Sequence, residues 1–127
     1  MRIAVPVKWS ALRTEFDPLT GEPTTLDGRF GLDPASSSAL EWALSLGAQR
    51  DVEVNVITVG PAAAEAGLRS ALAAGAARAA RIEAGSGAGS PAVAAALAGE
   101  TGDADLIVCG AWSEDGGSGS IAPALAA

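Results

Sequence analysis

Glycine and serine are concentrated in the stretch "GAWSEDGGSGSI" (110–121), which directly follows an apolar segment. Glycine has no side chain to obstruct the approach of a ligand to backbone N–H groups. The stretch contains four glycines: Gly110, Gly116, Gly117 and Gly119. Ser118 and Ser120 add hydroxyl donors, and the helix expected to follow favours negative charge at its amino end. The stretch therefore predicts a cradle for an anion such as phosphate, with a flexible turn as the alternative.

No standard phosphate-binding motif accounts for this stretch. A P-loop needs Gly-Lys followed by Ser or Thr, and the glycine spacing also differs from G-x-G-x-x-G. The acidic pair Glu114 and Asp115 would repel a phosphate, unless Asp115 instead caps the loop by accepting from backbone N–H groups. Lys8, just after the first apolar segment, is the candidate cation, and it either meets a phosphate or is solvated.

The composition disfavours several classes of function. The chain has no histidine, which removes Ser-His-Asp triads, Cys-His pairs and most zinc sites, and no metal site is predicted. The net charge of −7 and the absence of a Lys/Arg run disfavour nucleic-acid binding. Cys109, the single cysteine, is interpreted as a small buried hydrophobe, which fits a reducing compartment. With no signal peptide or membrane-spanning segment predicted, a cytoplasmic location is expected.

The 127 residues suffice for one domain, in which apolar segments alternate with helical patterns. Buried strands are predicted at 2–7, 52–59, 79–82 and 105–110, and helices at 34–46, 61–76, 91–99 and from about 118. Asp33 before Pro34 is typical of a helix N-cap. Trp42 on the first helix, and Leu68 and Leu72 on the second, are predicted to face the core. This alternation predicts an open, mainly parallel α/β sheet with flanking helices.

Residues 11–30 interrupt the alternation. Turn signals occur at Asp17-Pro18, Thr20-Gly21 and Asp27-Gly28. They predict a hairpin excursion between the first strand and the first helix. Pro6 lies inside the first strand, and because proline cannot donate to a central ladder, it predicts an edge position or a bulge.

In a parallel sheet the carboxyl ends of the strands meet at one edge, where ligands bind. The first strand ends at Lys8 and Trp9, the second at Gly60-Pro61, and the last at 110–121. These three ends are therefore expected to lie together. Trp9 and Trp112 are predicted to cover the rim of the sheet, with stacking on a purine as the alternative.

Five ordered segments resemble the beta subunit of electron transfer flavoproteins over nearly the whole chain. They are "AVPVKW", "DPLTGE", "LDPASSSALEWALSL", "VITVGPAAAEAGLRSALAAGAARAARIE" and "DLIVCGAWSEDGGSGSIAPALAA". The last is similar to the family's nucleotide loop. The opening "MRIAVPVKW" and the "GSGS" loop look closest to the mycofactocin-associated branch. The resemblance implies a Rossmann-like fold of the adenine-nucleotide alpha-hydrolase type.

The resemblance also implies an electron carrier, not an enzyme, with no catalytic residues of its own. In that family the beta subunit binds AMP, or a second FAD in bifurcating members, while the redox FAD lies mainly on the alpha subunit. An alpha-like subunit and a dehydrogenase donor are the implied partners. By position, the implied nucleotide contacts are Pro6, Asp33, Pro34, Ala35, Ser36, Val59, Gly110, Ala111, Trp112, Ser113, Glu114, Asp115, Gly116, Gly117, Ser118, Gly119, Ser120 and Ile121.

The chain departs from the family pattern within this set. Asp33 stands where the family usually has asparagine, and so loses an amide donor. Gly117 replaces an acidic residue, Ser120 a glutamine and Trp112 a polar residue. Altered nucleotide binding is one expectation. Because family members continue for roughly another half-chain, residues 1–127 are expected to be the nucleotide-binding domain without the family's C-terminal part.

Two other classes of protein remain open at this point. A universal-stress-like adenine-nucleotide-binding protein shares the strand, glycine loop and helix, but its loop has glycine where this chain has Ser113. A non-binding structural protein would instead dimerise through the alanine-rich helices.

Overall fold

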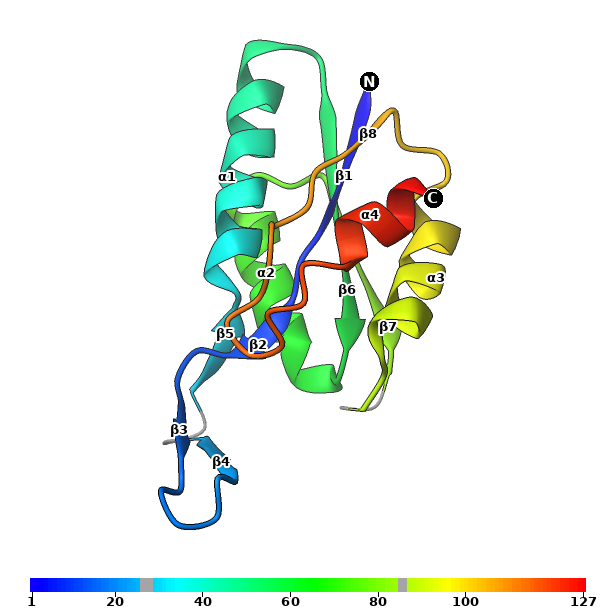
Figure 1. Ribbon diagram of the computed structural model, residues 1–127. Coiled ribbons are helices and arrows are strands. Elements are labelled where there is room, and N and C mark those ends of the chain that lie inside the picture. Colours follow the sequence, from blue (N-terminus) through cyan, green and yellow to red (C-terminus); the bar gives the residue numbers. More distant parts are fainter. Residues whose placement is uncertain (26–28, 85–86) are drawn as a thin grey trace.

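Four parallel strands form one sheet in the computed structural model, which describes residues 1–25, 29–84 and 87–127 (Figure 1). The strands are β1 (Arg2–Pro6), β6 (Glu53–Gly60), β7 (Arg78–Glu83) and β8 (Leu106–Ile107), in the order β7-β6-β1-β8. Each strand pairs in parallel with its neighbour. The predicted parallel α/β sheet is therefore confirmed.

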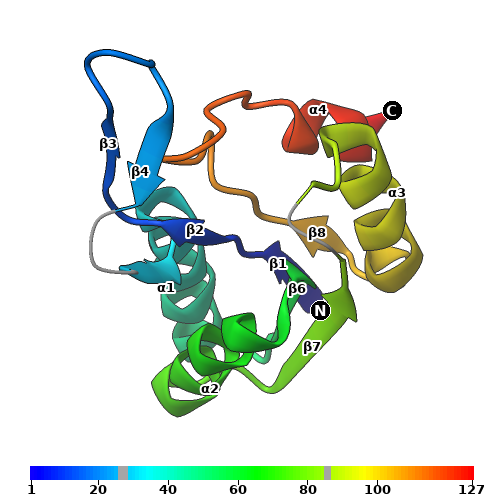
Figure 2. The same ribbon diagram turned by 90° about the horizontal axis from the view of Figure 1, so that it is seen from below.

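Helices cover both faces of the sheet (Figure 2). On one face lie α1 (Pro34–Gln49) and α2 (Glu65–Ala74), the latter preceded by a short 3-10 turn, η2 (Ala62–Ala64). On the other face lie α3 (Ser90–Thr101) and α4 (Ile121–Ala126). Right-handed crossovers between parallel strands produce this two-sided cover. Within the described ranges, no helix combines the length and hydrophobicity needed to cross a bilayer.

The helix boundaries largely follow local signals. Asp33 caps α1 as predicted, its carboxylate accepting from the N–H of Ala35 at 3.0 Å. Gly75 ends α2 with a φ of +120°, a backbone conformation that favours glycine. The helix predicted from about 118 begins only at Ile121, because Gly119 has a φ of +59° and interrupts a right-handed helical backbone.

Two side chains predicted to face the core are exposed instead. The face that α1 turns to the sheet consists of Ser36, Ala39, Leu40 and Ala43. Trp42 lies off this stripe, since residues advance by about 100° around a helix, and the residue is 54% exposed. In α2, Leu68 is buried as predicted, whereas Leu72 lies at the margin of the buried stripe and is 44% exposed.

β1 lies inside the sheet, so the predicted edge position of Pro6 is wrong, and its pairing with Ile57 continues the register without a bulge. Successive residues of a strand donate to opposite sides, and Val7 donates to the carbonyl oxygen of Ile57 in β6 at 2.8 Å. The nitrogen of Pro6 therefore faces β8. No donor is needed there, because the pairing of β1 with β8 ends at Ala4 and Ile107.

The last predicted strand, 105–110, shrinks to the two residues of β8. Val108 still donates to the carbonyl oxygen of Ala4 at 2.9 Å. The next bond along this ladder would need the N–H that Pro6 lacks. The chain therefore leaves the sheet early and crosses to the amino end of α1, where Gly110 packs.

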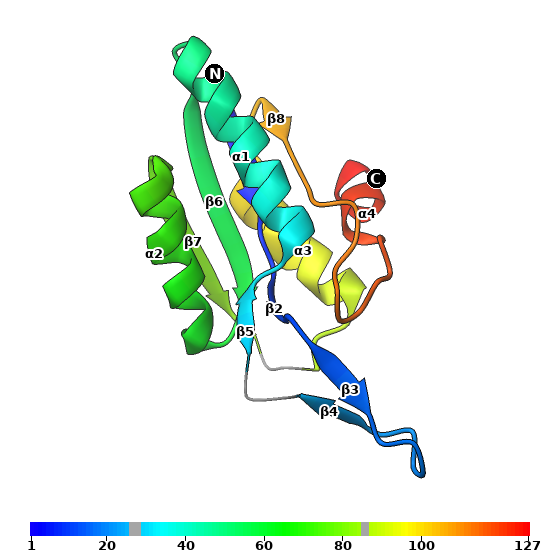
Figure 3. The same ribbon diagram turned by 90° about the vertical axis from the view of Figure 1, so that its left-hand side faces the viewer.

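The predicted hairpin excursion is present and consists of two small antiparallel pairs. β2 (Trp9–Ala11) pairs with β5 (Phe30–Leu32), and β3 (Thr14–Phe16) pairs with β4 (Pro23–Thr25). The outer pair projects away from the body of the protein (Figure 3). Its turn is closed by the N–H of Gly21, which donates to the carbonyl oxygen of Asp17 at 2.8 Å. The predicted turn at Asp27-Gly28 lies outside the described residues.

Candidate functional site

A cavity of about 690 Å³ lies at the carboxyl ends of β1 and β6. The three strand ends expected at one edge all contribute to it, since Lys8, Gly60 and the 110–121 stretch line its wall. Most of the predicted contacts are in its lining: Pro6, Ser36, Val59, Gly110, Ala111, Trp112, Ser113, Asp115, Ser118, Gly119, Ser120 and Ile121. The remaining predicted residues are not in the lining: Asp33, Pro34, Ala35, Glu114, Gly116 and Gly117.

The cavity is also lined by residues that sequence reasoning missed. They are Phe30, Ala63, Ala84, Ala88, Ser90, Val93 and Leu97. Val93 and Leu97 are four residues apart on α3, a spacing that places both on one side of a helix. That spacing indicates an apolar helix face, but the sequence does not show that this face meets the 110–121 stretch.

The backbone of the 110–121 stretch leaves several N–H groups unused. Gly117 donates to the carbonyl oxygen of Ser113 at 2.9 Å, which closes one turn of the loop. Gly117 and Gly119 both have a φ of +59°, a conformation that side chains disfavour. Within the described ranges, the N–H groups of Ser118, Gly119 and Ser120 have no acceptor from the protein. This row of donors lies beside the cavity.

Gly110 lies in close contact with the first turn of α1. A Cβ atom added there would lie 2.8 Å from the carbonyl carbon of Ala35 and 2.9 Å from the nitrogen of Ser36. Both contacts are with backbone atoms, which cannot move aside as a flexible side chain would. The loop therefore begins at a point where only glycine fits.

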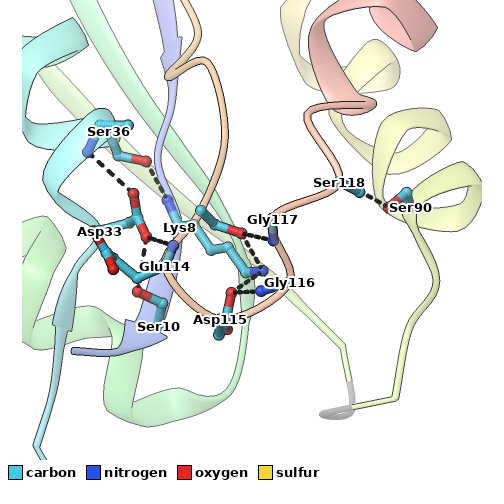
Figure 4. A network of polar contacts seen from close by, with 12 residues as sticks. Lys8, Ser10, Asp33, Ser36, Ser90, Glu114, Asp115, Gly116, Gly117 and Ser118 are labelled. Atoms are coloured by element: carbon cyan, nitrogen blue, oxygen red, sulfur yellow. Dashed lines mark hydrogen bonds and ion pairs between the residues drawn. The ribbon is translucent and has the colours of Figure 1, made fainter. Parts of the chain in front are cut away.

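Asp33 connects the loop to the amino end of α1 (Figure 4). One carboxylate oxygen accepts from Ala35, and the other accepts from the hydroxyl of Ser10 at 3.1 Å and from the N–H of Glu114 at 2.7 Å. The side chain is buried. Its predicted role as a helix cap is confirmed, and the bond to Glu114 spans a long separation in the sequence.

Lys8 forms an ion pair with the loop. Its Nζ lies 2.6 Å from Oδ1 of Asp115 and 3.0 Å from Oγ of Ser113. Asp115 also accepts from the N–H of Gly116 at 2.6 Å, so the predicted capping role of this carboxylate is confirmed. Burial alone would raise the pKa of Asp115, but the hydrogen bonds from Lys8, Gly116 and Ser113 outweigh it and hold that pKa below its ordinary value.

Aromatic and sulfur-containing side chains complete the cavity. Trp9 and Trp112 both line it, and Trp112 is 54% exposed. Cys109 also lines the cavity and is only half-buried, so the prediction of a small buried hydrophobe is wrong. The predicted strand would have contained Cys109, but β8 ends at Ile107. Burial nonetheless raises the pKa of the Cys109 thiol.

A sequence model of the electron transfer flavoprotein domain matches residues 25–127. The chain belongs to this family. Electron transfer flavoproteins are electron carriers built from alpha and beta subunits. The matched residues include α3 and the whole 110–121 stretch, and so most of the cavity wall lies within the electron transfer flavoprotein domain. A comparison with curated protein sequences finds no match.

Proposed function

We propose that this protein is a beta-type subunit of an electron transfer flavoprotein and that its cavity binds AMP or FAD. The observation that carries the proposal is the row of N–H groups at Ser118, Gly119 and Ser120, which have no acceptor among the described residues and lie beside a cavity of about 690 Å³. Cavities that bind small molecules typically measure about 300–1,000 Å³. The family match favours this function over a universal-stress-like nucleotide binder.

The residues of the cavity suit an adenine nucleotide. Successive backbone N–H groups form a concave surface that binds phosphate oxygens. The hydroxyls of Ser118 and Ser120, which hydrogen-bond to each other at 2.9 Å, lie in the same part of the lining. Val59, Val93 and Leu97 offer an apolar wall for the adenine ring. Because α4 is only a single short helix of six residues, the proposal rests on the loop backbone and not on a helix dipole.

The cavity offers little positive charge to a phosphate. Lys8 is the lysine that lines the cavity, and Asp115 already neutralises it. The chain as a whole carries a net charge of −7. The proposed phosphate site therefore relies on hydrogen bonds from the backbone, which discriminate by geometry and not by net charge.

In the proposed complex this chain contributes binding and orientation. FAD, when bound, would supply electron transfer, whereas AMP would serve as a structural ligand. The loop backbone would hold the phosphate, and Trp112 at the mouth would limit access of water. We further propose an alpha-type subunit as the partner, a dehydrogenase as the electron donor, and the mycofactocin-associated branch as the subgroup. Residues 1–127 would form the nucleotide-binding domain.

Isothermal titration calorimetry with AMP tests the site. Gly119→Val should weaken AMP binding at least about tenfold, because valine disfavours a φ of +59° and the loop must rearrange. Gly21→Val is the matched control, since Gly21 also has a positive φ but lies in the projecting turn. Absence of AMP and FAD binding by the unmodified chain would contradict the site. Mixing with an alpha-type subunit should give a yellow complex with flavin absorbance.

A further inference from the structure

The carboxylate of Asp33 is surrounded by donors and is withdrawn from the cavity. It is 1% exposed and accepts from the N–H of Ala35, the hydroxyl of Ser10 and the N–H of Glu114. A carboxylate can accept at both oxygens, and here both are occupied by protein donors. The residue therefore satisfies groups of the protein and does not contact a ligand in the cavity.

The three donors come from separate parts of the chain. Ser10 belongs to β2 at the end of the first strand segment, Ala35 to the first turn of α1, and Glu114 to the glycine-rich loop. Asp33 also donates its own N–H to the carbonyl oxygen of Lys8 at 2.9 Å. One buried side chain thus ties the loop to the two rigid elements beneath it.

We infer that Asp33 is a positioning residue that fixes residues 113–115, and through them the row of N–H groups at 118–120, relative to the cavity. The expected effect of this positioning on nucleotide binding rests on the proposed function. Lys8 supports the same segment from the side, because its Nζ donates to Ser113 and Asp115. The bonds from Lys8 are exposed, whereas the bond from Glu114 to the buried Asp33 side chain is part-buried.

In this chain an amide cannot accept from all three donors that surround the Asp33 carboxylate. Asparagine has a single acceptor oxygen, and its NH₂ group would face a donor on the other side. In Asp33→Asn the helix cap is retained, because asparagine is as good an N-cap as aspartate. Because the amide oxygen keeps the cap on Ala35, the hydrogen bond lost in Asp33→Asn is the one from the N–H of Glu114. The variant Asp33→Asn therefore tests the positioning of the loop while the helix cap, which has a purely structural role, stays in place.

Residue-resolved amide hydrogen exchange by NMR, with AMP calorimetry on the same samples, tests the inference. In Asp33→Asn, exchange of the Glu114 N–H should accelerate about tenfold and AMP binding should weaken about tenfold, with the unfolding midpoint nearly unchanged. Asp17→Asn is the matched control. Asp17 also caps backbone N–H groups, those of Leu19 and Thr20, but it does so through one oxygen, which asparagine keeps.

The two readouts decide different questions. Unchanged exchange at Glu114 in Asp33→Asn overturns the positioning role, whatever happens to AMP. Faster exchange at Glu114 supports it even if the unmodified chain binds no AMP, a result that would contradict only the proposed function. Asp33→Ala, which also removes the helix cap, should lower the unfolding midpoint. If Asp33→Asn lowers it equally, Asp33 acts through the fold and the inference fails.

Discussion

The two faces of the sheet are built differently. On the side of α1 and α2, the buried cluster includes large side chains such as Ile3, Val5 and Val56. On the side of α3 and α4, within the described part of the chain, the buried cluster consists of Ala4, Ile57 and Leu97, with partly buried residues around it. The first face is a packed core, and the second leaves space that becomes the cavity.

The difference originates in the alternation of side chains along one strand. In β1, Ile3 and Val5 point to the α1 side, whereas Ala4 and Pro6 point to the α3 side. Small residues on that side keep the cavity open at the carboxyl end of the strand. Folding free energy is thus concentrated on one face and the proposed binding function on the other.

A matched pair of core substitutions tests this difference most directly. Ile3→Ala should lower the free energy of unfolding by about 3–5 kcal/mol, because Ile3 is surrounded by a dense buried cluster. Ile57→Ala removes the same atoms from the looser face and should lower it by about 2–3 kcal/mol. Urea unfolding monitored by circular dichroism measures both. A larger effect at Ile57 would contradict the assignment of the main core to the α1 side.

Glycine substitutions test a place where the cavity wall meets the packed face. Gly110→Ala should lower the free energy of unfolding by about 1–3 kcal/mol, because its Cβ would press on the backbone of Ala35 and Ser36. Gly99→Ala is the control, since Gly99 lies inside α3 with open space around it, and alanine should raise stability by up to about 1 kcal/mol. Equal stability of the two variants would contradict the prediction, because it would mean that the loop shifts at Gly110 and makes room for the added Cβ atom.

Features specified by neighbouring residues were predictable from the sequence. The start of α1 follows from Asp33 and Pro34, because capping is a local interaction, and the end of α2 follows from Gly75. The place of the cavity also followed, since clefts in parallel sheets lie at the carboxyl ends of the strands. That rule needs only the order of the elements, which the alternation of strands and helices supplies.

Features that depend on a distant partner were not predictable. Pro6 is tolerated in a central strand because β8, the neighbour on the side of its nitrogen, is paired with β1 only as far as Ala4. Which strand becomes that neighbour depends on packing of residues about 100 positions away. The sequence predicts Trp42 in the core, but Ser36, Ala39, Leu40 and Ala43 form the buried stripe of α1. The bond between Asp33 and Glu114 and the contribution of α3 to the cavity both depend on how separate elements pack.

Of the substitutions considered, loss of the ion pair between Lys8 and Asp115 should have the smallest effect on the free energy of unfolding, because both side chains are partly exposed at the cavity. Asp115→Asn should lower the free energy of unfolding at pH 7 by less than about 1 kcal/mol, since both side chains are partly exposed. The pKa of Asp115 is lowered in the folded state, so its contribution is present above the unfolded value of about 3.9 and is lost as pH falls through the folded value. The stabilities of the two proteins should therefore converge below about pH 4.

The same variant should affect AMP binding in the opposite direction. Removing the carboxylate frees Lys8 for the phosphate, so AMP affinity should rise several-fold at low salt, and the gain should shrink as salt screens the charge. Lys8→Met is the control, because it removes the cation and should weaken AMP binding while changing stability equally little. A fall in AMP affinity in Asp115→Asn would show that the ion pair shapes the loop for binding. The Asp115 carboxylate would then be, like Asp33, a group that positions the loop. In that case the cavity on the α3 side would owe its shape to polar contacts, whereas the α1 side owes its stability to apolar packing.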